Sequence, residues 1–344
     1  MSSSSQPKMV TVLGAGSWGT ALAIQLSRKS HDVTLWGHSP DHLKTISRDH
    51  ENRQYLPGVQ MPGSLSLNPD IASAVEVAEI VVVAVPSHAF RTTLQKIRST
   101  IPDDTTVVWA TKGVEKESHK LLHQVIEEEL GSGRKKALLS GPTFAKEVAQ
   151  GLPTAVTIAS DEIEHAHTIA ELFHSETFRC YTSNDIPGIE IGGATKNVLA
   201  IAAGIADGLG FGANSRAALI TRGLHELIKL GTDYGGKAET FMGLGGLGDL
   251  VLTCTDNQSR NRRFGIAIGK GKTAEAALKE IGQTVEGFDA ARDINQIALS
   301  RGIEMPITKQ VADVLHNNKN PKMAVRDLLQ RGLKTENQET SEKA

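Results

Sequence analysis

The sequence has little of several things that mark particular classes of protein. Its 344 residues include two cysteines, Cys180 and Cys254, which lie far apart and match no zinc-binding or redox spacing. We therefore expect free thiols in a reducing compartment, and no metal site. The 37 lysines and arginines nearly balance 39 aspartates and glutamates, which gives a formal net charge of −2. This balance offers no electrostatic reason to expect nucleic acid or an acidic membrane surface as a partner.

Long apolar runs are also scarce. The longest uninterrupted one, IVVVAV at 80–85, is too short to cross a bilayer, and the opening segment MSSSSQPK lacks the apolar core of a signal peptide. We therefore expect no membrane insertion and a cytoplasmic location. The contents of 39% hydrophobic and 22% charged residues are those of an ordinary globular protein, and the length suits two domains.

The first half of the chain alternates strand-like and helix-like segments. Short apolar runs rich in β-branched residues occur at 9–13, 32–36, 80–85, 105–110, 137–139 and 154–159. Amphipathic stretches such as 87–98 and 117–130 lie between them. Continuous apolar runs are typical of fully buried parallel strands, so the pattern predicts an α/β domain with a doubly wound parallel sheet.

The second half changes to helical periodicity. Helix-like segments follow one another at 190–207, 215–232, 259–269, 285–300, 306–316 and 321–331. We expect the first domain to cover 9–188 and an all-α domain to cover 189–331, with the boundary inside 182–190. The Ser-rich start (1–8) and the polar tail (332–344) are expected to be disordered.

A glycine turn follows the first predicted strand, in Gly14-Ala15-Gly16-Ser17-Trp18-Gly19. Gly14 would allow a tight turn, Gly16 would let the backbone approach a pyrophosphate, and Gly19 would let the next helix pack close to the strand. The helix N-terminus would then hold the phosphates on its free N–H groups. This context predicts a Rossmann-like dinucleotide-binding domain, and the alternative is a glycine turn without a ligand.

The end of the strand at 32–36 bears on the choice of nucleotide. NAD-specific proteins usually place an acidic side chain there to hold the ribose 2′-OH. This chain offers His38 instead and no carboxylate before Asp41. A 2′-phosphate would not be repelled, so we expect NADP or NAD. His38 is otherwise a solvated residue at the start of a helix.

Other strand ends should meet at the same edge of the sheet. They carry Pro86-Ser87, then Thr111-Lys112-Gly113, then Ser140-Gly141-Pro142-Thr143. The second of these turns would aim a cation into the crevice, and the third has N–H groups and hydroxyls suited to an anion. Each is also compatible with ordinary loop chemistry.

A lysine in the second half has unusual neighbours. Helical spacing places Lys196 on one face with Ile189, Gly192, Gly193, Ala200 and Ala203. Small neighbours would leave the ammonium partly desolvated, which lowers its pKa and favours proton exchange near neutral pH. The alternative is a lysine that extends to the surface from a helix packed through glycines.

The segment 243–263 holds a carboxylate and an arginine in special settings. Asp249 follows four glycines, so it lies where backbones can crowd together. Ser259-Arg260-Asn261 comes at a predicted helix N-terminus with Ser259 as its cap, an arrangement suited to a phosphate dianion. Arg262 and Arg263 are expected to be solvated cations.

Ten motifs occur in the order found in a known family. They are GAGSWGTALA (14–23), NRQYLPG (52–58), AVPSH (84–88), TKG (111–113), LSGPTFAKEV (139–148), ATKNVLAIAAG (194–204), ITRGLHE (220–226), GLGDLVLTC (246–254), SRNRRFG (259–265) and VEG (285–287). From about residue 9 to 331 the chain resembles the bacterial NAD(P)-dependent glycerol-3-phosphate dehydrogenases. The resemblance implies a 6-phosphogluconate-dehydrogenase-like fold and the reversible reduction of dihydroxyacetone phosphate to sn-glycerol 3-phosphate with NADPH or NADH. It also implies a homodimer and a part in supplying glycerophospholipid synthesis.

The resemblance further implies roles for single residues. The nucleotide would be bound by Gly14, Gly16, Ser17, Trp18, Gly19, His38, Lys112, Ala145, Arg260, Thr284 and Glu286. The substrate would be bound by Lys112, Gly141, Thr143, Lys196, Asp249, Ser259, Arg260 and Asn261, the last three at its phosphate. Lys196 would donate and accept the proton, with Asp249 and Lys112 as the other catalytic residues. The chain departs from the family pattern at His38, where many relatives have arginine, at Gly245, where alanine is common, and at Thr143, where serine is frequent.

Three other functions stay open. A related two-domain reductase of β-hydroxy or keto acids would share the fold, but it needs a carboxylate clamp rather than the phosphate signature at 259–261. A four-electron oxidation would use Cys254 as a covalent nucleophile, although the apolar run LVLTC favours a buried thiol. A dinucleotide-binding redox sensor would need a partner surface, and the sequence has no basic stripe of the DNA-binding kind.

Overall fold

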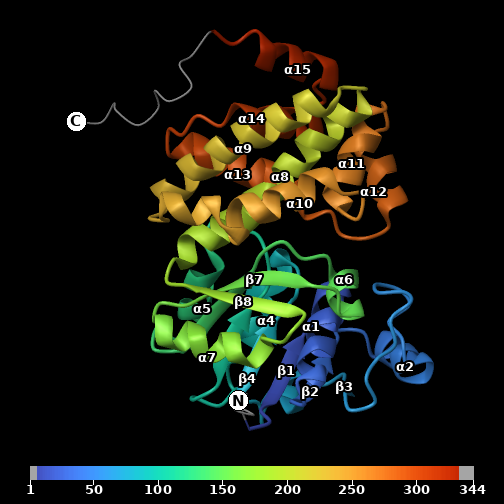
Figure 1. Cartoon of the computed structure of the whole chain (residues 1–344), viewed down its shortest axis with the longest axis vertical. Coiled ribbons are helices and arrows are strands. Elements are labelled where there is room, and N and C mark those ends of the chain that lie inside the picture. Colours follow the sequence, from blue (N-terminus) through green and yellow to red (C-terminus); the bar gives the residue numbers. More distant parts are fainter. Residues whose placement is uncertain (1–5, 333–344) are drawn as a thin grey trace.

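The computed structural model describes residues 6–332. Figure 1 shows a sheet with its covering helices in one half of the molecule and a group of packed helices in the other. This arrangement confirms the predicted fold class, an α/β domain followed by an all-α domain. Of the segments expected to be disordered, 1–5 and 333–344 lie outside the described residues.

Eight strands form one sheet. They are β1 (Met9–Leu13), β2 (Asp32–Trp36), β3 (Ser66–Asn68), β4 (Ile80–Val83), β5 (Thr106–Trp109), β6 (Lys136–Ser140), β7 (Thr154–Ala159) and β8 (Phe178–Ser183). Their order is β3-β2-β1-β4-β5-β6-β7-β8, and all neighbours from β3 to β6 are parallel. The order reverses between β1 and β4, so the carboxyl ends of these strands border the crevice where such sheets bind ligands.

The prediction of a wholly parallel sheet is wrong at β7. This strand pairs with β6 in the antiparallel sense, and β8 then runs parallel to β7. The short helix α6 (Ala145–Gln150) between β6 and β7 is bound to α1 (Ser17–Arg28) through Arg28, whose guanidinium donates to the Val148 carbonyl. The chain therefore stays at the end of the sheet where β6 finishes, and β7 starts from that same end. Because β7 is an apolar and largely buried run like the parallel strands before it, its composition does not reveal its direction.

Helices cover both faces of the sheet, and apolar clusters fill the space between. Besides α1 and α6 they are α2 (Pro40–Asp49), α3 (Ile71–Val75), α4 (Ser87–Ile97), α5 (Leu122–Leu130) and α7 (Ile163–Phe173). The predicted helix at 87–98 is α4. The helix predicted at 117–130 begins five residues late, because His119 has a φ of 56°, a left-handed conformation that an α-helix cannot contain.

The helical half is built around one central helix, α8 (Ile186–Gly208). The others are α9 (Ala213–Asp233), α10 (Asp249–Thr255), α11 (Arg260–Gly269), α12 (Ala274–Ile281), α13 (Glu286–Ser300), α14 (Pro306–His316) and α15 (Pro321–Leu329). Helix α8 is long and apolar enough to cross a membrane by length and composition. Its most apolar stretch is wholly buried by the surrounding helices, as expected for the core helix of a globular domain.

Close backbone contacts lock α8 against its neighbours. A Cβ on Gly204 would lie 2.2 Å from the Arg262 carbonyl oxygen of α11. A Cβ on Gly192 would lie 2.5 Å from the Gly245 carbonyl oxygen, in the π-helical turn Leu244–Gly248 that leads into α10. Glycine is therefore required at both places, and the N-terminal ends of α10 and α11 are held firmly against α8.

Candidate active site

The glycine turn after β1 has the geometry that its sequence predicts. Gly14 has a φ of +121°, and a Cβ there would lie 2.8 Å from the Ala84 carbonyl oxygen. A Cβ on Gly19 would lie 1.9 Å from the Gly14 carbonyl oxygen. By contrast, a Cβ on Gly16 would meet nothing within 4 Å among the described residues. Gly14 and Gly19 thus serve tight packing, whereas Gly16 leaves open space in front of α1.

The N-terminus of α1 offers donors to that space. Gly16 is its cap residue and, among residues 6–332, no side chain caps it. The indole Nε1 of Trp18 is buried and has no hydrogen-bond partner in the described part of the chain. Unpaired N–H groups at the positive end of a helix dipole bind phosphate well. The residues present therefore fit the pyrophosphate of a dinucleotide.

The end of β2 lacks an acidic group directed at a ribose, within the part of the chain that is described. His38 is exposed. Ser39 caps α2, because its hydroxyl accepts a hydrogen bond from the His42 backbone N–H at 3.3 Å. The Asp41 carboxylate pairs with Lys44 at 3.0 Å. Both interpretations of His38, nucleotide contact or solvated residue, are compatible with this geometry.

A carboxylate held between two ammonium groups lies at the centre of the molecule. Asp249, the first residue of α10, accepts from Lys112 Nζ at 2.6 Å through Oδ2 and from Lys196 Nζ through Oδ1. Asp249 is 0% exposed and Lys196 is 5% exposed. The alternative that Lys196 extends to the surface is therefore wrong, because the glycines of α8 bring the π-helical turn and Asp249 over it.

The charges in this cluster shift each other's protonation. Burial and the nearby Lys112 ammonium lower the pKa of Lys196 to about 8, although Asp249 opposes the change. Burial alone would raise the pKa of Asp249, but the two ammonium groups outweigh burial and hold it below its usual value. The cluster therefore carries a net positive charge and a lysine that can exchange its proton near neutral pH.

Further hydrogen bonds fix the two lysines. Lys196 Nζ donates to Thr253 Oγ1 at 3.0 Å, and that hydroxyl donates to the Asp249 carbonyl oxygen at 2.6 Å. Lys112 Nζ donates to the Gly141 carbonyl oxygen at 3.2 Å. Thr253 is not among the residues predicted from the sequence. Its spacing of four residues from Asp249, which puts both on one face of α10, is the signal that could have found it.

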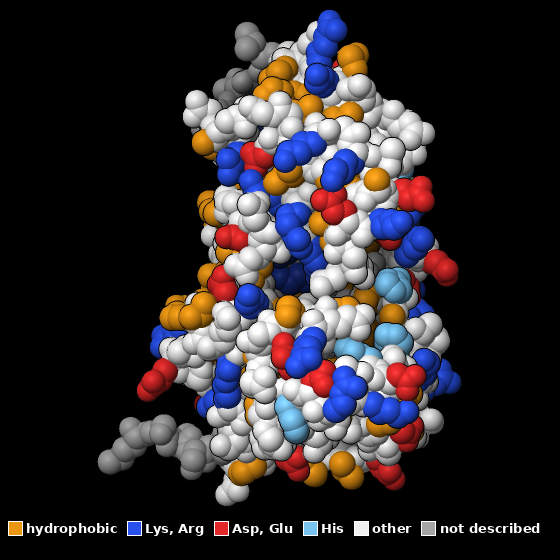
Figure 2. Space-filling view, turned by 90° about the vertical axis from the view of Figure 1, so that its right-hand side faces the viewer, with side chains coloured by type: hydrophobic (Ala, Val, Ile, Leu, Met, Phe, Trp, Pro, Cys, Tyr) orange, Lys and Arg blue, Asp and Glu red, His pale blue; other side chains and the backbone are white. Residues whose placement is uncertain are grey.

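Lys112, Lys196 and Thr253 line the floor of a cleft of about 350 Å³ between the two halves, and Asp249 lies buried behind them. Figure 2 shows this hollow with lysine and arginine side chains gathered in it. Its cations are Lys112, Lys146, Lys196, Arg260 and Arg263, and Glu286 is its carboxylate. A positive cleft of this kind attracts and concentrates anions.

Most predicted site residues line the cleft. Those that do are Ser17, Trp18, Lys112, Thr143, Ala145, Lys196, Ser259, Arg260, Asn261 and Glu286. The other predicted residues lie behind or beside it, namely Gly14, Gly16, Gly19, His38, Gly141, Asp249 and Thr284. Lining residues to which the sequence analysis gave no role are Tyr55, Leu56, Pro57, Ala110, Phe144, Lys146, Asn197, Thr253, Gln258, Arg263 and Gln283.

The start of α11 forms one corner of the cleft. The Ser259 hydroxyl accepts from the Arg262 backbone N–H at 3.2 Å, which confirms Ser259 as the helix cap. The guanidinium of Arg260 reaches Gln283 Oε1 at 3.4 Å, a long contact that leaves its remaining N–H groups toward the cleft. Arg263 is exposed, as expected. The expectation of a solvated Arg262 is wrong, because its side chain is buried against Asp207 and Asn257.

Asn261 is tied into a chain of hydrogen bonds. Its Oδ1 accepts from the Gly287 backbone N–H at 2.9 Å, and its Nδ2 donates to Asn197 Oδ1 at 2.9 Å. Asn197 in turn donates to Glu286 Oε2 at 3.1 Å. These bonds fix the orientation of the Asn261 amide, and a phosphate at this corner would also meet the backbone N–H of Asn261 in the first turn of α11.

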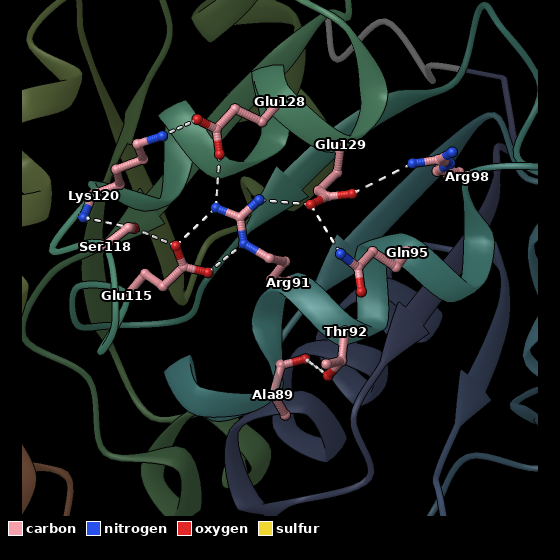
Figure 3. A network of polar contacts seen from close by, with 10 residues as sticks. All are labelled: Ala89, Arg91, Thr92, Gln95, Arg98, Glu115, Ser118, Lys120, Glu128 and Glu129. Atoms are coloured by element: carbon pink, nitrogen blue, oxygen red, sulfur yellow. Dashed lines mark hydrogen bonds and ion pairs between the residues drawn. The ribbon is translucent and has the colours of Figure 1, made fainter.

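The loop that follows Lys112 is anchored on its outer side. Figure 3 shows Arg91 of α4 reaching three carboxylates, those of Glu115, Glu128 and Glu129. The pair with Glu115 is bidentate, with N–O distances of 2.5 and 2.7 Å. These carboxylates raise the pKa of Arg91. A bidentate ion pair three residues from Lys112 restricts how far that lysine can move.

The two thiols are both free. Cys254 is 1% exposed, and burial raises its pKa to about 12. A thiol of this kind is a poor nucleophile, so the structure favours the buried-thiol interpretation over covalent catalysis. Residues 6–332 contain no group of three or more His, Cys, Asp or Glu side chains placed to hold a metal ion.

Comparisons with known proteins cover nearly the whole chain. Residues 9–166 match the family model of the NAD-dependent glycerol-3-phosphate dehydrogenase N-terminus, and residues 185–326 match that of its C-terminus. Glycerol-3-phosphate dehydrogenase [NAD(P)+] of Pseudoalteromonas translucida is 53% identical over 328 residues, which are 95% of this chain and 98% of that protein. The crystal structure of glycerol-3-phosphate dehydrogenase from Coxiella burnetii superposes with a TM-score of 0.92 at 45% identity, covering 94% of this chain and 99% of the other.

A more distant likeness concerns the fold alone. A ketopantoate reductase from Ralstonia eutropha superposes with a TM-score of 0.59 at 16% identity, over 92% of this chain and 99% of the other. The two-domain architecture is thus shared with reductases of other substrates, and the chemistry has to be decided by the residues of the cleft.

Proposed function

The chain belongs to the NAD-dependent glycerol-3-phosphate dehydrogenase family, and on that basis we propose that it reduces dihydroxyacetone phosphate reversibly to sn-glycerol 3-phosphate with NADPH or NADH. The observation that carries the proposal is the cluster of Lys112, Asp249 and Lys196 on the floor of a positive cleft. A phosphorylated ketone needs both a proton donor for its oxygen and cations for its phosphate, and the cleft provides both.

Lys196 is the proton donor in this proposal. When bound, the nicotinamide ring supplies the hydride to the carbonyl carbon in the reduction and accepts it in the oxidation. Negative charge develops on the carbonyl oxygen, and a Lys196 ammonium with a pKa of about 8 can give its proton to that oxygen. General acid catalysis of this kind contributes about 10²–10⁴-fold to a rate. In the oxidation the neutral amine takes the proton back.

Asp249 and Lys112 prepare the proton donor. Asp249 holds the Lys196 ammonium in place, together with the hydroxyl of Thr253. Lys112 adds a second positive charge beside the developing oxyanion, in a buried setting where charge interactions are stronger than in water. Gly141 and Thr143 border the same space.

The substrate phosphate is assigned to the corner at the start of α11. Arg260 presents a planar fork of donors, and the first turn of the helix adds the N–H groups of Arg260 and Asn261 behind the Ser259 cap. Binding energy gained at the phosphate also orients the reacting ketone.

The nucleotide is assigned to the other side of the cleft. Its pyrophosphate fits the space in front of Gly16 with Ser17 and Trp18 at the start of α1. Ala145 and Glu286 line the cleft where the nicotinamide end would lie. Thr284 precedes Glu286 in the same segment, and His38 lies at the adenosine end, where the absence of a carboxylate is compatible with both nucleotides.

Initial rates test the proposal directly. The purified protein is assayed with dihydroxyacetone phosphate and either NADPH or NADH, next to a panel of 2-keto acids at equal concentrations. We expect rapid oxidation of the nucleotide with the phosphorylated ketone and none above background with the keto acids. Turnover of a keto acid without turnover of the ketone phosphate would replace this function with that of the related reductases.

Wider aspects of the proposal rest on the family and on sequence patterns, not on the cleft. They are two domains at 9–188 and 189–331, a homodimer, a cytoplasmic location and a part in supplying glycerophospholipid synthesis. Light scattering of the purified protein at micromolar concentration tests the oligomeric state, and a mass close to 36.8 kDa would contradict the homodimer.

A further inference from the structure

A second buried carboxylate links the two halves of the molecule away from the cleft. Glu190 of α8 is 5% exposed. Its Oε1 accepts from the indole Nε1 of Trp109 at 3.1 Å and from the His123 backbone N–H at 3.1 Å. Its Oε2 pairs with His123 Nδ1. Trp109 ends β5 and His123 lies in the first turn of α5, so all three bonds cross from the sheet to the central helix.

Glu190 and Trp109 each lie a few residues along the chain from one of the two lysines of the cluster. Glu190 precedes Lys196 by six residues on one continuous helix, a rise of about 9 Å at 1.5 Å per residue. Trp109 precedes Lys112 by three residues, which span at most about 10 Å. The Glu190 carboxylate therefore connects β5, the strand that leads to Lys112, with α8, the helix that carries Lys196.

A carboxylate is a costly choice for a packing role at this place. Removing a charge from water costs several kcal/mol, and an apolar side chain of similar volume often gives equal or greater stability. The directional donors of Trp109 and His123 instead define where Glu190 lies along and around the α8 axis. Burial lowers the pKa of His123, but Glu190 and Glu127 outweigh burial and Lys136 and raise it, which favours the charged form beside Glu190.

We propose that Glu190 is a positioning residue for the reaction. Through its bonds to Trp109 and His123 it sets the register of α8 against β5, and that register sets the separation of the Lys112 and Lys196 ammonium groups around Asp249. It touches neither substrate nor nucleotide. The inference rests on the proposed function, since it concerns the lysine that protonates the carbonyl oxygen.

Matched variants of buried glutamates test this role. Glu190→Gln keeps the shape and loses the charge that pairs with His123, and Trp109→Phe removes one donor while it keeps an aromatic ring. Glu226→Gln is the control. Glu226 is 4% exposed on α9 and accepts hydrogen bonds from the Ile307 and Thr308 N–H groups at the start of α14, with no link to either lysine. For each protein we measure kcat, KM for dihydroxyacetone phosphate, the Kd of NADPH by fluorescence, and the melting temperature.

We expect Glu190→Gln to lower kcat about tenfold, because small displacements of a reacting group can cost up to ~10²-fold in rate. KM and the NADPH Kd should stay within about twofold, since neither binding corner is moved. Trp109→Phe should lower kcat in the same direction by a smaller factor. Glu226→Gln should change the melting temperature without changing kcat at a temperature where it is folded.

Two results would overturn the inference. One is a wild-type kcat in folded Glu190→Gln, or in Trp109→Phe if the first variant does not fold. The other is an equal loss of kcat in Glu226→Gln, which would show that any buried glutamate in the helical half has this effect. An inactive wild-type protein would instead overturn the proposed function, so the two failures are distinguishable.

Discussion

Lys112 and Asp249 are 137 residues apart in the chain, and the Lys112 ammonium lies 2.6 Å from the Asp249 carboxylate. The lysine comes from the end of a strand in the sheet half, and the aspartate begins a helix in the helical half. Lys196 approaches the same carboxylate from α8. The centre of the cleft therefore exists only when both halves are folded and docked, and the roles of Lys196 and Asp249 in it can each be tested separately.

Replacement of Lys196 by alanine should abolish the chemical step and spare nucleotide binding. The variant loses the proton donor, so kcat should fall by about 10²–10⁴-fold. The nucleotide is assigned mainly to the ends of α1 and β2, so the Kd of NADPH should remain near the wild-type value. Lys196→Arg serves as the control, because it keeps a positive charge that does not release its proton near neutral pH.

Arginine at this position should be about as inactive as alanine. Single-turnover kinetics on both variants separate the chemical step from release of product. Wild-type turnover by Lys196→Ala would remove Lys196 from the mechanism. Full activity of Lys196→Arg would instead reduce its role to that of a fixed charge.

The pH dependence should differ in sign between the two directions. Reduction requires the Lys196 ammonium, so kcat/KM for dihydroxyacetone phosphate should be level below the Lys196 pKa of about 8 and fall about tenfold per unit above it. Oxidation requires the neutral amine, so kcat/KM for sn-glycerol 3-phosphate should rise up to about pH 8 and then level off. Profiles that have the same slope in both directions between pH 7 and 10 would contradict this assignment.

Asp249→Asn should move that profile to lower pH. Burial and Lys112 both lower the pKa of Lys196, and the Asp249 carboxylate is the group that opposes them. Its loss should leave the Lys196 pKa below about 8, so that reduction declines at a lower pH than in the wild type. Titration of kcat/KM for both proteins in one buffer series measures the difference. If kcat/KM of the variant declines at the same pH as in the wild type, or at a higher pH, the observed pKa belongs to another group.

Much of this arrangement was readable from local patterns. Runs such as 9–13 and 32–36 became strands because continuous β-branched apolar segments suit a sheet that is covered on both faces. The glycine turn was recognisable because Gly14, Gly16 and Gly19 have distinct steric duties at fixed spacing. Long helices such as α13 and α14 were found almost to the residue, since their apolar positions repeat over several turns.

Local patterns could not predict the direction of a strand within the sheet or the burial of a single polar side chain. The antiparallel direction of β7 depends on where α6 ends relative to the sheet, and the composition of β7 does not encode this. The edge strands β3 and β8 are short or half-exposed and lack a buried run. The burial of Lys196 and the pairing of Glu190 with Trp109 depend on contacts between segments far apart in the sequence. Thr253 shows that the helical neighbours of a suspected catalytic residue are worth testing as its partners.

Gly16 and Gly19, which are three residues apart, should respond in opposite ways to replacement by alanine. A Cβ at Gly16 meets no described atom within 4 Å and the φ of −78° suits any residue, so Gly16→Ala should fold with a melting temperature close to the wild type. The new methyl group would occupy the space assigned to the pyrophosphate, so the Kd of NADPH should rise at least about tenfold, the effect of ~1.4 kcal/mol.

Gly19→Ala should instead destabilise the fold. Its Cβ would lie 1.9 Å from the Gly14 carbonyl oxygen, so α1 must shift away from β1. Overpacking of this kind costs about 1–3 kcal/mol or more of the free energy of unfolding, which urea titration measures. Unaltered NADPH binding by Gly16→Ala would mean that the nucleotide does not lie in front of α1, whereas a stable Gly19→Ala would mean that the turn and α1 can separate without cost.

Arg260→Ala should weaken binding of the phosphorylated ketone. A hydrogen bond to a charged group contributes about 1.5–3 kcal/mol, so KM for dihydroxyacetone phosphate should rise about 10- to 150-fold. Dihydroxyacetone, which lacks the phosphate, provides the internal comparison, because its poor turnover should be nearly the same in the variant and the wild type. Arg292→Ala is the matched control, since Arg292 is an arginine of α13 that pairs with Asp289 at 2.8 Å on the surface. If KM rises equally for both substrates, or not at all, the phosphate site lies elsewhere in the cleft and Lys112, Lys146 or Arg263 becomes the cation to test.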